Sequence, residues 1–170
     1  MENLSVYFGH KLELIQPSVW KTYFELRSDD EIIGTMKKIK TLGSQMEVSL
    51  FNKTWTIYPP SIWRSEIDIK ESGKALPFAK YKKERFKSRG IVELPKGARL
   101  KIVFKAFKKG YEVQDSSGQV LVKLVDKMKL RTTVEIFIEK RSEMIDKYPW
   151  IIMLAWYISE QSKHIAVVAA

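Results

Sequence analysis

The strongest candidate for chemistry in this sequence is a basic segment near its middle, residues 79–89 (AKYKKERFKSR). Six cations accompany a single glutamate there, and two aromatic residues, Tyr81 and Phe86, stand among them. Lysine and arginine attract anionic lipid headgroups, and aromatic rings lie at membrane interfaces or stack on bases. A solvated loop, or an edge strand protected by lysines, would have a similar composition. We expect an anion-binding site made of Lys80, Lys82, Lys83, Arg85, Lys87 and Arg89.

Three shorter basic groups could enlarge this site. Each contains three cations within five residues, and each lies outside the central segment. They extend the site only if the fold brings them to residues 79–89. The groups are Lys37, Lys38 and Lys40; Lys105, Lys108 and Lys109; and Lys127, Lys129 and Arg131.

Residue patterns typical of catalysis or metal binding do not occur in the sequence. His10 and His164 are far apart and have no neighbouring ligand pattern, and residues 29–31 (DDE) lack the glycine-containing loop of an EF-hand. There is no nucleophile elbow, P-loop or dinucleotide-binding glycine motif. We therefore expect no enzymatic activity, no metal and no cofactor. An enzyme on an unrecognised barrel would instead place paired ionisable groups in a deep pocket.

Composition limits the remaining possibilities. The 170 residues favour one domain, residues 1–170, and lysine and arginine outnumber aspartate and glutamate by 30 to 20. That formal charge of +10 favours anionic partners, although an inert basic surface would show it too. The absence of cysteine excludes disulfides and thiolate catalysis and fits a reducing cytoplasm. The N-terminal residues show no signal-peptide pattern.

Most of the chain alternates between apolar and polar residues, as β-strands do. Residues 46–50, 100–106 and 134–138 are clear examples, and residues 4–15 predict a hairpin or a bent strand broken at Gly9. The tryptophans, Trp20 included, are expected in the core or at the barrel rim. Ten or more candidate strands follow one another at intervals of about 8–12 residues, which predicts a sandwich or a barrel.

One pattern occurs three times in the chain. An apolar–acidic–apolar strand end is followed by a polar turn and an apolar return strand. Leu26, Ile69 and Val113 are corresponding positions, 43 and 44 residues apart. This regular spacing suggests a repeated β unit, although hairpins in any β protein resemble one another.

A strongly apolar stretch near the end must be covered by these strands. Eight of the nine residues in Trp150–Ile158 are large and apolar, so they predict a buried helix rather than a surface helix. The expected helix spans about 148–164, with Pro149 in its first turn. A membrane span needs about 20 apolar residues, and polar residues follow this run directly. The core residues expected from it are Trp150, Ile151, Leu154, Trp156 and Ile158.

These features resemble the tubby C-terminal-like superfamily, which includes tubby proteins, LURP-one-related proteins and phospholipid scramblases. The resemblance is carried by the three strand–turn–strand phrases Leu26–Ile33, Ile69–Leu76 and Val113–Leu121, by the strand Thr132–Glu139 and by Trp150–Ile158. It implies a closed antiparallel barrel of about twelve strands around a hydrophobic C-terminal helix. It also implies a non-enzymatic domain in a superfamily with members that bind membrane lipids.

The sequence departs from that family in three respects. It has neither the cysteine-rich segment nor the proline-rich arm of scramblases, and no stretch matches the phosphoinositide site of tubby proteins residue by residue. No functional residue is therefore transferred from the family. We expect a cytoplasmic binding or scaffolding domain that recognises anionic phospholipid as a peripheral membrane protein, with no transmembrane span. The alternative is a nucleic-acid-binding barrel that uses its basic face.

Overall fold

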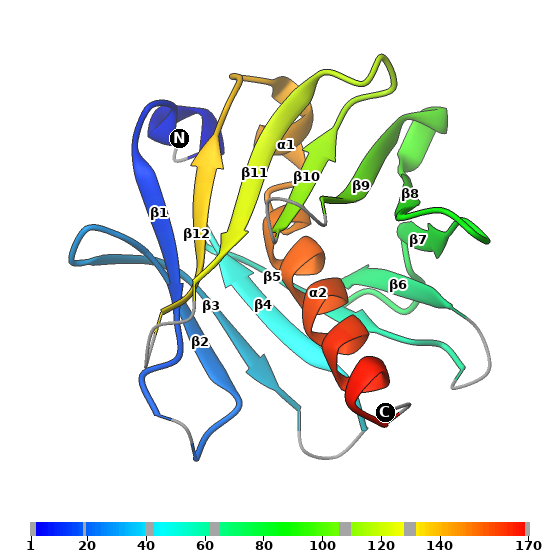
Figure 1. Ribbon diagram of the computed structural model, residues 1–170, viewed down its shortest axis with the longest axis horizontal. Helices are drawn as coiled ribbons and strands as arrows, with labels where there is room; N and C mark the ends of the chain where they lie inside the picture. Colours follow the sequence, from blue (N-terminus) through cyan, green and yellow to red (C-terminus); the bar gives the residue numbers. More distant parts are fainter. Residues whose placement is uncertain are drawn as a thin grey trace.

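The computed structural model of the chain describes residues 3–18, 20–39, 43–61, 65–105, 110–127 and 132–168. Twelve strands in these residues form a barrel, and a long helix lies against their inner side (Figure 1). The strands are β1 (Lys11–Ile15), β2 (Tyr23–Ser28), β3 (Glu31–Lys38), β4 (Met46–Leu50), β5 (Lys53–Tyr58), β6 (Glu66–Glu71), β7 (Ala79–Lys83), β8 (Arg89–Glu93), β9 (Arg99–Lys105), β10 (Gly110–Gln114), β11 (Val120–Asp126) and β12 (Thr132–Ile138). The helices are η1 (Leu4–Tyr7), η2 (Pro95–Gly97), α1 (Glu143–Lys147) and α2 (Ile151–Val168).

The barrel is an antiparallel meander that closes on itself. Each strand pairs with the next one in the chain, and β12 pairs back with β1, where Leu14 lies opposite Val134. Alternating side chains then point to the inside and the outside. In β4, for example, Met46, Val48 and Leu50 are buried, whereas Glu47 is half-buried. The predicted fold class, an all-β closed barrel around one hydrophobic helix, is confirmed.

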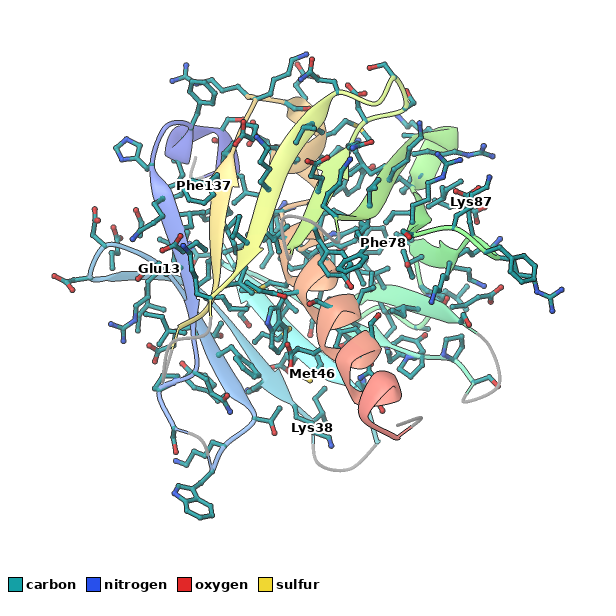
Figure 2. All side chains as sticks on the ribbon, viewed as in Figure 1. Glu13, Lys38, Met46, Phe78, Lys87 and Phe137 are labelled. Atoms are coloured by element: carbon teal, nitrogen blue, oxygen red, sulfur yellow. The ribbon has the colours of Figure 1, made fainter. Side chains whose placement is uncertain are left out.

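Helix α2 supplies the centre of the core. Residues 151–159 are all buried, and so is Trp150 just before them. The Trp156 ring lies 4.3 Å from that of Phe24, and the Trp150 ring lies 5.8 Å from that of Phe78, which Figure 2 shows beside the helix. The five core residues expected from this stretch, Trp150, Ile151, Leu154, Trp156 and Ile158, are all at most 8% exposed.

The predicted bounds of this helix, about 148–164, are wrong at both ends. Helix α2 begins at Ile151, because the residue before a proline disfavours helical geometry, and Tyr148 has φ −123°. The short helix α1 precedes it, with the Ser142 side chain as its N-cap. At the other end, α2 continues four residues beyond the expected end, to Val168.

Residues 4–8 do not form the predicted strand. They contain the 3-10 helix η1, and Gly9, with φ +81°, turns the chain into β1. Leu4 is fully buried, whereas Val6 and Phe8 are exposed. The backbone N–H of Ser5 donates a hydrogen bond to the Asp146 carboxylate, 2.8 Å away, so η1 is fixed to α1.

The three repeated strand–turn–strand segments form the hairpins β2–β3, β6–β7 and β10–β11, at intervals of four strands. The acidic residue just before Leu26, Ile69 and Val113 is buried in each copy. Each of these carboxylates has a basic neighbour on the outer face, which compensates for its burial. The distances are 2.9 Å for Arg27 Nε to Glu25, 3.6 Å for Lys80 Nζ to Asp68 and 3.5 Å for Lys105 Nζ to Glu112.

Candidate functional site

The order of the strands decides which connections lie together. Because consecutive strands are antiparallel, connections alternate between the two ends of the barrel. The connections β1–β2, β3–β4, β5–β6, β7–β8, β9–β10 and β11–β12 therefore share one end, which we call the basic end. The other five connections, with η1 and α1, lie at the opposite end. Helix α2 runs toward the basic end, where the Tyr157 hydroxyl donates to the Ser44 carbonyl oxygen, 2.9 Å away.

The two ends differ strongly in charge. In the described part of the six connections at the basic end there are four lysines and arginines and a single acidic residue, Glu84. The five connections at the opposite end contain two lysines and three aspartates. These four cations are Lys21, Arg85, Lys87 and Lys127.

All four basic groups of the sequence have members at this end. Lys37 and Lys38 end β3, Lys105 ends β9, and Lys127 follows β11. Strand β9 and the β7–β8 connection are adjacent, because the Phe104 N–H donates to the Ser88 carbonyl oxygen, 2.7 Å away. Figure 2 shows Lys38 and Lys87 at well-separated points of the molecule, so the cations form a rim rather than a cluster. Lys40, Lys108, Lys109, Lys129 and Arg131 lie outside the described residues.

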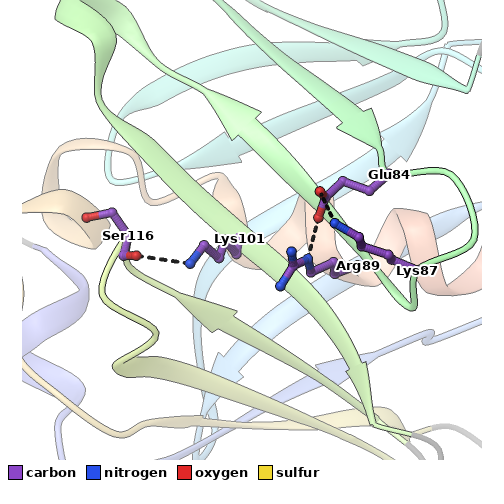
Figure 3. Close-up of polar contacts among 5 residues, drawn as sticks. All are labelled: Glu84, Lys87, Arg89, Lys101 and Ser116. Carbon is purple, nitrogen blue, oxygen red and sulfur yellow. Dashed lines mark hydrogen bonds and ion pairs between the residues drawn. The ribbon is translucent and has the colours of Figure 1, made fainter.

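The β7–β8 connection, residues 84–88, is a tight hairpin at this rim. The Glu84 N–H donates to the Arg89 carbonyl oxygen at 3.1 Å and closes the turn. The Glu84 carboxylate accepts hydrogen bonds from the Lys87 ammonium, 3.1 Å away, and from the Arg89 guanidinium (Figure 3). These two bonds, chiefly that from Arg89, lower the pKa of Glu84 below the ordinary glutamate value, at which the carboxylate is already ionised at neutral pH.

The six predicted binding residues divide into three kinds. Lys80 lies on the outer face of β7, 3.5 Å from Glu66, and stabilises the barrel wall. Lys82, Lys87 and Arg89 are exposed but form ion pairs, Lys82 with Glu93 at 3.0 Å and the other two with Glu84. Lys83 and Arg85 are exposed, and neither has an ion-pair partner among the described residues. The cations that are available for an external anion therefore concentrate at the hairpin tip.

The sequence predicted the exposed aromatic side chains at the basic end only in part, because, of the two rings in residues 79–89, Phe86 is exposed and Tyr81 is buried. Trp20 in the β1–β2 connection is 92% exposed, so of the two expected places, the core and the barrel rim, it occupies the rim. Phe86 at the hairpin tip is completely exposed, and Phe104 is partly exposed at the end of β9. Pro17 before Trp20 and Lys21 after it were the available signs that the strand pattern had not yet begun.

The described residues contain neither a metal-binding cluster nor a helix that could span a membrane. No group of three or more histidine, aspartate or glutamate side chains there is arranged to hold a metal ion. None of the helices in that part of the chain combines the length and the apolar character that crossing a membrane requires.

Comparison with known proteins shows a related fold. The chain is similar to the X-ray structure of a protein from Arabidopsis thaliana, with a TM-score of 0.65, covering 94% of this chain and 96% of that one. No protein-family model and no curated protein matches the sequence. The two chains share 9% of their residues, so the similarity extends to the barrel fold alone.

Proposed function

We propose that this chain is a tubby-like, non-enzymatic barrel domain that binds anionic phospholipid membranes through its basic end. One observation carries the proposal: four basic groups that are separate in the sequence all have members at the same end of the barrel. On this reading the protein is cytoplasmic and attaches to a membrane as a peripheral protein. The family assignment rests on the sequence resemblance together with the barrel and its apolar helix.

Electrostatics gives the proposal its physical basis. Each lysine or arginine near an anionic leaflet contributes about 1 kcal/mol to binding, and this contribution falls off within a Debye length. A charged rim at the end of a barrel can approach a flat surface with many cations at once, whereas cations spread over a wall cannot. The opposite end has more acidic than basic residues in its connections, so it would not compete for the same surface.

Nucleic acid is the second candidate, because exposed aromatic rings beside cations also stack on bases. The arrangement favours the membrane for a geometric reason. Single-stranded nucleic acid follows a continuous groove, whereas the exposed rings of Trp20 and Phe86 belong to connections six strands apart. A planar partner can reach both rings together.

Vesicle sedimentation tests the proposal. The wild type should pellet with vesicles containing phosphatidylserine or phosphoinositide and stay in solution with phosphatidylcholine alone. Lys83→Glu/Arg85→Glu should lose binding, because it reverses the two cations at the hairpin tip that have no ion-pair partner in the described part of the chain. Lys74→Glu/Lys96→Glu is the matched control, since it changes the net charge equally at the opposite end.

Equal binding by the two double variants would contradict the proposal. So would a wild type that ignores anionic vesicles but is retained on DNA or RNA with a salt dependence that corresponds to several phosphate contacts. That second result would favour the nucleic-acid candidate.

A further inference from the structure

Phe86 occupies a position that costs the fold stability. It lies at the tip of the β7–β8 hairpin with φ +58°, in the left-handed region that residues other than glycine, asparagine and aspartate rarely adopt. Its ring is completely exposed, so it makes no packing contribution that could offset this cost. Lys83, Arg85 and Lys87 surround it in the sequence. An exposed ring in a strained backbone position suggests a role outside the folded domain.

Trp20 is the corresponding feature on the other side of the rim. It is 92% exposed in the β1–β2 connection, with Lys21 next to it. In a closed barrel of twelve strands, the β1–β2 and β7–β8 connections are six strands apart, so they lie on opposite sides of the same end. Figure 1 shows the two connections projecting from the molecule at widely separated points.

We infer that Phe86 and Trp20 insert into the interfacial layer of an anionic membrane and thereby hold the barrel end-on to it. The inference rests on the proposed function and adds to it a hydrophobic contribution and an orientation. Aromatic rings are favoured at the boundary between headgroups and acyl chains, and the neighbouring cations pair with the headgroups. Two anchors on opposite sides of the rim define a line across the barrel end, which a single anchor would not do, and the cations around the rim restrict rocking about that line.

Substitutions at Phe86 separate insertion from charge. Phe86→Asn leaves every cation in place and should weaken binding to phosphatidylserine vesicles about tenfold, with a similar loss for Trp20→Ser. Binding by the double variant should be purely electrostatic and should disappear at high salt, whereas the wild type retains part of its binding. Asparagine adopts left-handed backbone readily, so Phe86→Asn should resist denaturant at least as well as the wild type, which excludes misfolding as the cause.

A spectroscopic measurement completes the test. In a Trp20→Ser background, used for both variants of this test because native Trp20 would itself shift, Phe86→Trp should show a blue shift of its tryptophan emission when phosphatidylserine vesicles are added. Leu76→Trp is the matched control, because Leu76 is also largely exposed (78%) but lies in the β6–β7 connection at the opposite end. A blue shift in the first variant and none in the second supports end-on insertion.

The possible failures are distinguishable. If the wild type pellets with the vesicles but Phe86→Trp shows no blue shift and Phe86→Asn binds normally, insertion is wrong and electrostatic binding stands. If Leu76→Trp shifts as much as Phe86→Trp, the end-on orientation is wrong. If the wild type does not bind vesicles at all, or the shift appears only with RNA, both the inference and the proposed function are overturned.

Discussion

Glu84 gives the sharpest test of how the β7–β8 hairpin uses its charge. It is the single acidic residue in the described part of the six connections at the basic end, and its carboxylate is bound by Lys87 and Arg89. Those two partners lower its pKa below the ordinary glutamate value, so the carboxylate is ionised at neutral pH with an added margin. The substitution Glu84→Gln removes one negative charge and keeps almost the same side-chain volume, and we expect it to strengthen membrane binding.

The magnitude follows from the charges of the hairpin. Residues 82–89 contain five cations and Glu84, so the substitution raises their net charge from +4 to +5. One additional net positive charge near an anionic leaflet contributes about 1 kcal/mol, which corresponds to about fivefold tighter binding. Added salt should reduce this difference, because exposed charges are screened. Thermal stability should change little, since surface ion pairs contribute little to folding.

The assay is vesicle sedimentation over a series of phosphatidylserine fractions at fixed salt. Glu71→Gln is the control, because Glu71 is exposed at the end of β6, at the opposite end of the barrel, and its loss changes the net charge identically. Equal gains in the two variants would show that total charge matters and the hairpin does not. A loss of binding by Glu84→Gln would refute the reasoning too, since it would mean that the ion pairs shape the binding site.

Three further predictions concern the barrel itself. Trp156→Asp should abolish the cooperative unfolding transition seen by circular dichroism, whereas Trp156→Phe should stay folded. The reason is that a buried charge adds a penalty of several kcal/mol to the lost packing. A Trp156→Asp variant that stays folded and loses only membrane association would contradict the buried-helix assignment. Gly110→Ala should lower the free energy of unfolding by about 3 kcal/mol in denaturant titrations, because the new Cβ would overlap the backbone carbonyl of Leu124. Burial raises the pKa of Tyr81 and Tyr157 to about 12. The contribution of these two neutral tyrosines to the free energy of unfolding should therefore be complete below about pH 10 and be lost between about pH 10 and 12, because the tyrosines of the unfolded chain ionise first. Titration of tyrosinate absorbance, measured beside unfolding curves, checks this. Ionisation of both residues near about pH 10 in the folded protein would contradict it.

The fold was largely predictable because its strands alternate cleanly and its helix does not. Strand β12 lies within one residue of the predicted Thr132–Glu139, and all three repeated phrases form hairpins. The helix bounds were not predictable from hydrophobicity, which continues smoothly through Tyr148 and Pro149. A local backbone restriction before the proline, and not a change in polarity, decides where α2 begins.

The candidate site was predictable in its residues but not in its arrangement. The local density of positive charge identified the lysines of residues 79–89, yet it could not show that Lys80 pairs with Glu66 while Lys83 is exposed at the rim. Whether two connections share an end depends on the number of strands between them, so one missed strand reverses the answer. The exposure of Phe86 depends on a left-handed turn residue that no apolar pattern identifies.

The position of α2 in the chain also has a consequence for biogenesis. The helix that fills the barrel follows all twelve strands, and barrel closure joins β12 to β1, more than a hundred residues away in sequence. Such a high contact order predicts slow folding, because long loops must close before the contacts that stabilise them form. A growing chain on the ribosome would present unpaired strand edges and apolar inner faces until residues 151–159 have emerged. We therefore expect this protein to depend on chaperones during synthesis far more than its finished, edgeless barrel would suggest.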